Sequence, residues 1–207
     1  MKHTLLIKDW LSSFLSLLFP RCCVVCGRPL AKGEECICTV CNINLPRTNY
    51  HLRKDNPVER LFWGQIPLER ATSFFFYEKG SDFRLILHRL KYGGQKEIGA
   101  IMGRYMAAEL LSSNFFQGID VIIPIPLHKK KQQIRGYNQS EWIARGIAVV
   151  TGIPIDTESI LRKKNTETQT RKSVFERRDN VEGIFELQHP ETLAGKHICL
   201  LYTSSSP

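Results

Sequence analysis

Six of the seven cysteines of this 207-residue chain lie between positions 22 and 41. Four of them form two CxxC pairs, Cys23 with Cys26 and Cys38 with Cys41, and eleven residues separate the pairs. The two thiolates of each pair can converge on one ion, and two pairs make the tetrahedral four-sulfur set that suits zinc. The spacing therefore predicts a structural zinc ribbon, because four thiolates leave no coordination position open for a substrate.

Two further cysteines, Cys22 and Cys36, lie close to these pairs. Either of them could serve as a metal ligand in place of a neighbouring cysteine. We expect instead that both are small buried residues without a role in metal binding. Disulfides or free thiols are the alternative to metal. Clustered cysteines in a reducing cytosol favour metal binding.

A second chemical feature is the segment DVIIPIPLHKKKQQIRGYNQ, Asp120–Gln139. Its apolar run, Val121–Ile125, predicts a short buried strand, and Pro126 ends the strand because proline lacks the amide that a central ladder needs. A strand followed by a basic, glycine-containing loop and then a helix is a common phosphate site in α/β folds. The alternative is a solvated charged loop with no ligand.

Positive charge is concentrated in the second half of the chain. The formal net charge is +9, and residues 129–178 carry twelve basic side chains against five acidic ones. A field of this sign favours anionic partners such as nucleic acid, phosphorylated small molecules or acidic membrane. Residues 162–180 form a long polar stretch with only two apolar members, which predicts a lid over an anion or a solvated excursion.

Hydrophobic periodicity predicts alternating strands and helices, hence an α/β fold with a largely parallel sheet. A polar linker is expected at 47–56, where Pro57 follows. The expected strands are Ala71–Tyr77, Val121–Ile125, Ile153–Ile155, Gly183–Leu187 and one beginning in Gly195–Leu200. The first expected helix begins at Ser81 or Asp82 and ends at Gly93 and Gly94, with Lys91 and Tyr92 in its last turn. The other two run over Lys96–Leu111 and over Ser140–Thr151, the latter with Trp142, Ile143, Ile147 and Val150 facing inward.

The N-terminal segment, 1–19, has apolar residues at roughly helical spacing. Lys8 and Asp9 interrupt the apolar run, and the part after them is too short to span a bilayer. We expect an amphipathic helix that packs on the protein, no integral membrane segment and a cytoplasmic location. Peripheral membrane contact is the alternative.

Several segments, taken in order, resemble the ComF family of competence protein F and amidophosphoribosyltransferase-like proteins. They are FPRCCVVCGRPL with CTVCNINLP, RLKYGG at Arg89–Gly94, PIPLHKKKQQIRGYNQ at Pro124–Gln139, and RKKNTETQTRKSVFERRDNVEGIF at Arg162–Phe185. The resemblance implies a type I phosphoribosyltransferase-like parallel sheet behind an N-terminal zinc ribbon. It also implies a site for phosphoribosyl pyrophosphate with Mg²⁺, and the handling of single-stranded DNA in natural competence.

Carried over by position, the resemblance implies a pyrophosphate-binding loop and a lid. The loop residues are Pro126, Leu127, His128, Lys129, Arg135, Asn138 and Gln139. The lid residues are Arg162, Thr168, Gln169, Arg177 and Asn180. Lys91 lies in a family motif, to which the resemblance gives no role.

The resemblance also divides the chain into an N-terminal helix (1–19), a zinc ribbon (20–46) and a phosphoribosyltransferase-like domain (58–198). In the family, a strand ending in two acidic residues and a Thr-Gly-rich loop hold the ribose and its 5′-phosphate. The matching strand should begin at Gly195, but the sequence from Cys199 has neither feature. We therefore expect the last strands and the phosphoribosyl-binding loop to be missing, and residues 199–207 to be a non-native tail.

Two classes of function follow as expectations. The first is a protein of DNA uptake that binds phosphoribosyl pyrophosphate, single-stranded DNA or both, with other competence proteins as partners. Its enzymatic form would be a phosphoribosyltransferase (a glycosyltransferase) of nucleotide metabolism at full length. The chain as given is predicted to be inactive, because the ribose and 5′-phosphate ligands are absent. The second class is a non-catalytic zinc-ribbon module that binds nucleic acid or another protein.

Overall fold

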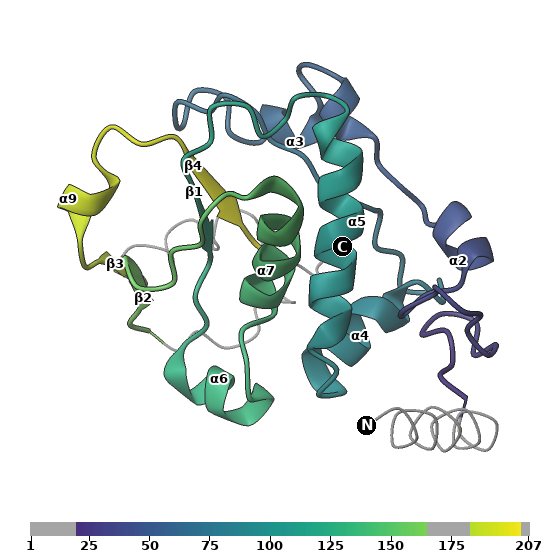
Figure 1. Ribbon diagram of the computed structural model, residues 1–207. Coiled ribbons are helices and arrows are strands. Elements are labelled where there is room, and N and C mark those ends of the chain that lie inside the picture. Colours follow the sequence, from purple (N-terminus) through teal and green to yellow (C-terminus); the bar gives the residue numbers. More distant parts are fainter. Residues whose placement is uncertain (1–19, 165–182, 204–207) are drawn as a thin grey trace, which may run out of the picture.

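The computed structural model describes residues 20–164 and 183–203 (Figure 1). The predicted N-terminal helix lies outside the described residues. The elements, in chain order, are α2 (Thr39–Ile43), η1 (Tyr50–Leu52), α3 (Pro57–Arg60), α4 (Arg84–Tyr92), α5 (Glu97–Leu111), β1 (Val121–Pro124), α6 (Lys129–Arg135), α7 (Gln139–Thr151), β2 (Ile160–Arg162), β3 (Phe185–Leu187), α9 (Pro190–Leu193) and β4 (Ile198–Leu201).

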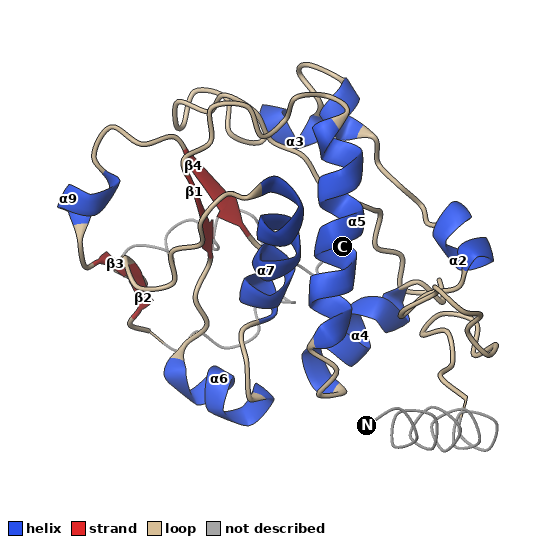
Figure 2. Ribbon diagram, viewed as in Figure 1, coloured by secondary structure: helices blue, strands red, loops and turns tan. Residues whose placement is uncertain are grey.

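The strands β1 and β4 form a parallel pair, which confirms a mixed α/β architecture with parallel pairing (Figure 2). All four residues of β1 are buried, as expected for a strand that is covered on both faces. On its other edge, Ile122 makes a single parallel bridge to Ile155, so β1 is the central strand. The predicted strand Ile153–Ile155 is thus reduced to one bridge.

The strand β4 extends the predicted strand Gly195–Leu200. It includes Cys199, Leu200 and Leu201, which the sequence predicts to belong to a non-native tail. Leu201 lies opposite Pro124 and is buried, and its carbonyl oxygen accepts a 2.9 Å hydrogen bond from the amide of Ile125. These three residues therefore belong to the hydrogen-bonded sheet.

A second sheet consists of β2 and β3. The predicted strand near 183–187 is present as β3, but it pairs antiparallel with β2, with Ile160 opposite Leu187 and Arg162 opposite Phe185. The expectation of parallel pairing is wrong for this strand, because β3 pairs with β2 as a separate two-stranded sheet instead of joining β1 and β4.

The helices α5 and α7 approach each other so closely that their contact needs glycine. A Cβ atom on Gly103 would lie 2.2 Å from the carbonyl oxygen of Ile143, and one on Gly146 would lie 2.0 Å from that of Ala100. Neither separation is possible between real atoms. Ile147, on α7, packs in the same buried cluster as Ile122 of β1, so α7 contacts both α5 and the sheet (Figure 2).

The cysteine-rich segment packs directly on α4 and α5. Its buried side chains share one hydrophobic cluster with Ile86 of α4 and with Ile98 and Met102 of α5. Two ion pairs, Arg104 with Glu35 and Arg47 with Glu109, add polar contacts along α5. The ribbon therefore lacks a separate core of its own and depends on these helices for apolar burial.

The segment expected to be a polar linker, 47–56, is folded. Thr48, His51 and Asn56 are buried in it. The Asn56 side chain caps α3 in a capping box with Glu59, and its amide nitrogen donates a 2.8 Å hydrogen bond to the carbonyl oxygen of Ala71. Satisfied polar side chains can be buried, which is why polarity alone misleads at this segment.

The predicted strand Ala71–Tyr77 is wrong. This segment makes one antiparallel bridge, between Phe75 and Arg47, and joins neither sheet. Its aromatic run is explained by packing, because Phe74 and Phe75 lie against the cluster that the ribbon shares with α4 and α5. Aromatic residues that fill a core can have the same composition as a strand.

The three long helices are confirmed within one to three residues at each end. Gly93 ends α4, and Gly152, with a φ of +74°, ends α7. Val150 was expected to face inward, but its side chain is 37% exposed because α7 buries only Ala144, Gly146 and Ile147 beyond its first turn. Among the described helices, none is long and apolar enough to cross a membrane.

We predict that Gly146→Ala lowers the free energy of unfolding by about 3 kcal/mol or more, because the added methyl group would overlap the backbone of Ala100. Urea denaturation followed by circular dichroism measures the change. Gly80→Ala is the matched control, since a Cβ at Gly80 meets no atom within 4 Å, and its effect should stay within about 0.5 kcal/mol. Equal losses for the two variants would contradict the role assigned to the helix contact.

Candidate metal centre and anion site

The predicted cysteine pairs meet in space. Among the described residues, the Sγ atoms of Cys23, Cys26, Cys38 and Cys41 all lie within 4.8 Å of one another. The Sγ atoms of Cys26 and Cys38 are 3.7 Å apart. Cys22 and Cys36 are not members of this group. The four close cysteines could hold a metal ion. The alternative ligand sets, which would include Cys22 or Cys36, are not the ones that the fold brings together.

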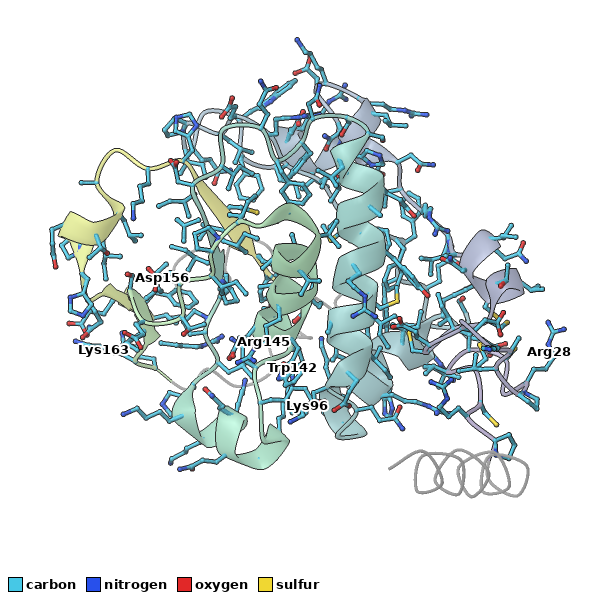
Figure 3. All side chains as sticks on the ribbon, in the orientation of Figure 1. Arg28, Lys96, Trp142, Arg145, Asp156 and Lys163 are labelled. Carbon is cyan, nitrogen blue, oxygen red and sulfur yellow. The ribbon has the colours of Figure 1, made fainter. Side chains whose placement is uncertain are left out.

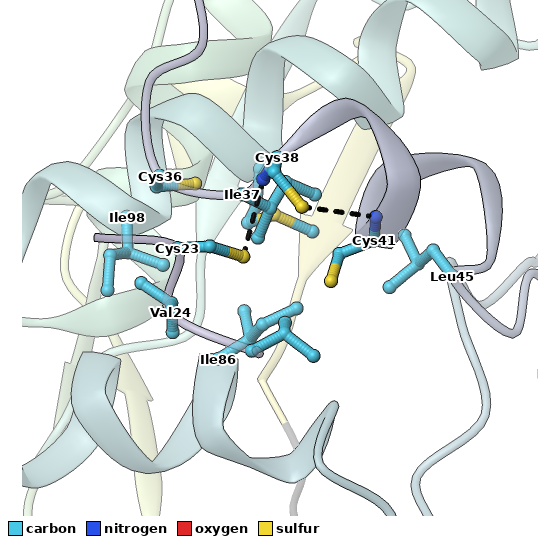
Figure 4. Close-up of a cluster of buried hydrophobic side chains, with 11 residues drawn as sticks. Cys23, Val24, Cys36, Ile37, Cys38, Cys41, Leu45, Ile86 and Ile98 are labelled. Carbon is cyan, nitrogen blue, oxygen red and sulfur yellow. Dashed lines mark hydrogen bonds between the residues drawn. The ribbon is translucent and has the colours of Figure 1, made fainter. Parts of the chain in front are cut away.

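Tight turns direct these thiols toward one another, and Figure 4 shows three of them, Cys23, Cys38 and Cys41. In the first turn the amide of Gly27 donates to the carbonyl oxygen of Cys23 at 2.9 Å, and Gly27 has a φ of +73° that favours glycine. In the second, Cys38 caps α2, and its Sγ accepts from the amide of Cys41 at 3.5 Å. The Sγ of Cys23 accepts from the amide of Cys38 at 3.3 Å, so the two turns are joined.

The chemistry of this donor set fits zinc. Four sulfur atoms and no oxygen or nitrogen match the tetrahedral set of a structural zinc site. Hydrogen bonds from the backbone and side chain of Arg28 lower the pKa of Cys26 to about 6, which favours the thiolate that binds metal. Burial raises the pKa of Cys36 to about 12, so this thiol stays protonated within the hydrophobic cluster.

The basic segment that follows β1 folds differently from the expected loop. Lys129–Arg135 forms the helix α6, because the Nδ1 atom of His128 accepts a 3.3 Å hydrogen bond from the amide of Lys130 and so caps the helix start. Gly136, with a φ of +78°, ends the helix. The sequence signal for a loop was the run of lysines, but lysine is a good helix former when a cap is present.

Asn138 fixes the turn between α6 and α7. Its side-chain oxygen accepts from the amide of Ser140 at 3.1 Å, and its Nδ2 donates to the carbonyl oxygen of Ile125 at 3.1 Å. One side chain therefore caps α7 and holds the chain that leaves β1. Pro126 and Leu127 are half-buried in that chain segment.

Contacts between distant segments bring α4 next to this turn. The Tyr137 hydroxyl donates a 2.6 Å hydrogen bond to the carbonyl oxygen of Leu90 near the end of α4. The guanidinium carbon of Arg135 lies 5.4 Å from the ring centroid of Tyr92. The RLKYGG and RGYNQ segments, more than forty residues apart in the sequence, therefore form one surface.

Lys91 is the unexpected member of this surface. Its side chain is only 8% exposed, although lysine is almost never fully buried without a partner. Burial, together with the nearby charge of Arg135, lowers the pKa of Lys91 to about 8. Within the described residues, no carboxylate acts on the pKa of Lys91. A buried cation beside a second cation is unfavourable unless an anion joins them.

Two further basic residues extend this arrangement. Burial lowers the pKa of Lys131, and the charges of Arg162 and Arg135 lower it further, so these three groups also lie close enough to repel. We call Lys91, Lys131, Arg135 and Arg162 the cation cluster. Its members come from α4, α6 and β2.

Gln139 completes the inner wall of this region. Its side chain is fully buried, and its Oε1 accepts a 2.9 Å hydrogen bond from Nη1 of Arg135. Its Nε2 has no hydrogen-bond partner among the described residues. An unsatisfied buried donor costs about 1–3 kcal/mol. The Gln139 side chain that orients Arg135 through Oε1 therefore lowers the stability of the fold through Nε2.

The other predicted site residues fall into two groups. Lys129 is exposed at the start of α6. Thr168, Gln169, Arg177 and Asn180 lie outside the described residues, and of the predicted lid only Arg162 is described. Sequence reasoning named Lys91 without a role and did not single out Lys131. The RLKYGG motif was the available signal, but its meaning depends on Arg135, which only the fold brings near.

A large apolar hollow lies elsewhere. It has a volume of about 1750 Å³, and its walls come from the aromatic run 74–76, the inner faces of α4 and α5, and β4. No member of the cation cluster lines it. The chemistry of this hollow is that of an apolar core, so we separate it from the anion site.

We predict about one zinc ion per chain, and we expect Cys38→Ser to lose it, because serine does not supply the thiolate that the tetrahedral site needs. The ribbon should then unfold at a lower temperature, since metal binding and folding are coupled in small zinc modules. Elemental analysis and thermal denaturation measure the two effects. Cys22→Ser, which alters an exposed thiol outside the cluster, should keep its zinc. Full zinc content in Cys38→Ser would refute the assignment.

Comparisons with known proteins give relatives along most of the chain. No family model and no solved structure matches. The DNA utilization protein YhgH of Escherichia coli O157:H7 is 29% identical over 200 residues, covering 89% of this chain and 85% of the relative. Competence protein F of Haemophilus influenzae is 29% identical over 106 residues, covering 50% of this chain and 46% of that protein.

A third relative extends the match in another organism. Competence protein ComFC of Bacillus subtilis is 25% identical over 176 residues, covering 83% of this chain and 71% of that protein. The chain is therefore similar to DNA utilization and competence proteins of the ComF type.

Proposed function

We propose that this protein acts in the uptake or use of DNA, and that its cation cluster binds the diphosphate of phosphoribosyl pyrophosphate. Support for the first part comes from the relatives, which are named as DNA utilization and competence proteins. Support for the second comes from a phosphate-type arrangement beyond the end of the parallel strand β1. We further propose a type I phosphoribosyltransferase-like fold, with which the β1–β4 pair and its flanking helices are compatible.

The observation that carries the proposal is the burial of Lys91 beside Arg135. Two cations held together without a carboxylate, among the described residues, form a site that lacks a counter-charge. A diphosphate supplies several negative charges in a small volume. The planar guanidinium of Arg135 can bind two phosphate oxygens at once, and the ammonium group of Lys91 acts as a point charge. Mg²⁺ would arrive with the diphosphate, since it binds substrate phosphates readily.

Single-stranded DNA is the second candidate ligand. The net charge of +9 and the basic residues around α6 favour a polyanion. The two candidates share the phosphate chemistry of the cation cluster, and they differ in their response to salt. Strand binding should weaken steeply with ionic strength, because each neutralised phosphate releases a counterion. The four-thiolate centre also favours a reducing compartment, so we propose a cytoplasmic location.

We assign no catalytic residue within the described chain. The open alternatives are an active phosphoribosyltransferase and a non-catalytic binding module. Release of pyrophosphate from phosphoribosyl pyrophosphate separates them. Binding without release would favour the module.

We predict that inorganic diphosphate and phosphoribosyl pyrophosphate with Mg²⁺ bind to the protein, and that Lys91→Met weakens both by about tenfold or more, because a charge-assisted contact is lost. Isothermal titration calorimetry measures the affinities. Lys130→Met is the matched control, since Lys130 is exposed and lies outside the cation cluster, and it should change binding little. Binding that is absent in the native protein, or equal in the two variants, would refute the site.

The affinity should also depend on pH. Lys91, with a pKa of about 8, is largely protonated at pH 7 and largely neutral at pH 9, so diphosphate binding should weaken as the pH rises between these values. In Lys91→Met, only the ligand and the other protein groups still titrate. The diphosphate affinity of this variant should therefore change less with pH than that of the native protein. Parallel curves for the two proteins would contradict the role of Lys91.

A further inference from the structure

The aromatic ring of Tyr92 lies on the surface next to the cation cluster. Its side chain is 66% exposed, whereas its neighbours Leu90 and Lys91 are buried. A single exposed tyrosine is ordinary on a protein surface. The surroundings of Tyr92 are what distinguish it, because the basic groups beside it would bind an anion.

Two side chains hold the ring in place. The guanidinium carbon of Arg135 lies 5.4 Å from the ring centroid of Tyr92, and the same guanidinium donates to the buried Gln139. His88 lies one helical turn before Tyr92 on α4, and the centroids of the two rings are 5.2 Å apart. The ring therefore has a defined orientation, and most of its surface remains available to a ligand.

We propose that Tyr92, together with the guanidinium of Arg135, forms a stacking site for one nucleobase of a single-stranded nucleic acid whose phosphates bind to the cation cluster. A base stacks favourably on an aromatic ring or on a guanidinium plane. A nucleotide carries a base and a phosphate in one unit, which matches an exposed ring directly beside the buried Lys91 and the half-buried Arg135. This inference rests on the proposed anion site and adds to it the class of ligand that can use both features.

The geometry also gives a preference for single strands. A base inside a duplex has both faces covered by its neighbours, so a ring on the protein can stack only on an unpaired base. Stacking is tolerant of sequence because every base has a π-face. The site should therefore select single strands over duplexes and show little preference among bases.

Trp142 is the nearest competing platform, and its surroundings argue against it. Figure 3 shows Trp142 between Lys96 and Arg145, near the start of α7. The two cationic groups lie 4.8 Å and 5.1 Å from its ring, and Arg145 is itself paired with Glu141 at 2.7 Å. Trp142 is also half-buried against α5 at Gly99. Its ring is already used in packing, so we assign the base to Tyr92.

The test compares two oligonucleotides of equal length by fluorescence anisotropy. One is dye-labelled oligothymidylate, and the other is an abasic strand that keeps the phosphates and lacks the bases. The native protein should bind oligothymidylate roughly tenfold to a hundredfold more tightly than the abasic strand, which is the range for one stacked base. Tyr92→Leu should remove most of this ratio, and Tyr92→Phe should keep it because the ring is retained.

Tyr202→Leu is the matched control. Tyr202 is also 66% exposed, and among the described residues no cation lies over its ring, so its removal should leave the ratio unchanged. An equal ratio in the native protein and in Tyr92→Leu would overturn the stacking site. A native protein that binds inorganic diphosphate but no oligonucleotide would also overturn the stacking site, while the proposed anion site would remain supported. A native protein that binds neither ligand would overturn both.

Discussion

Two glycines, Gly103 and Gly146, let the backbones of α5 and α7 come into direct contact, and this contact sets the positions of both candidate sites. The first residues of α7 include Gln139, which orients Arg135. The opposite side of α5 carries the ribbon through Met102 and the ion pair of Arg104 with Glu35. The candidate metal centre and the candidate anion site are thus fixed to the same pair of helices.

The two sites have opposite effects on stability. A metal ion bound by four thiolates would stabilise a ribbon that has little apolar core of its own, because it binds the folded chain in preference to the unfolded one. The cation cluster works against folding, since Lys91 loses its hydration and lies near another positive charge. Such an arrangement is typical of a binding site in which the ligand supplies the missing interaction.

Much of this architecture could be predicted from local sequence. The CxxC spacing identified the four cysteines, and glycines after periodic apolar segments located the ends of α4 and α7. The apolar run before Pro126 identified β1. These features are local, because caps, turns and strands depend on residues within a few positions of each other.

The failures have a common physical cause. Ala71–Tyr77 has the composition of a strand, but tertiary packing uses its aromatic side chains in the core beside the ribbon. Lys129–Arg135 is polar enough for a loop, but the imidazole of His128 supplies a helix cap. The role of Lys91 could not be read from its own segment, because it arises from Arg135, which follows forty-four residues later.

The central claim is that the cation cluster is built for an anion, and the pKa of Lys91 tests it most directly. Burial and the charge of Arg135 disfavour the protonated form, so NMR titration of the free protein should give a pKa of about 8. A bound diphosphate would favour the protonated form, so saturating inorganic diphosphate should raise this pKa toward the ordinary value of 10.5. A pKa that does not change on addition of diphosphate would contradict the account.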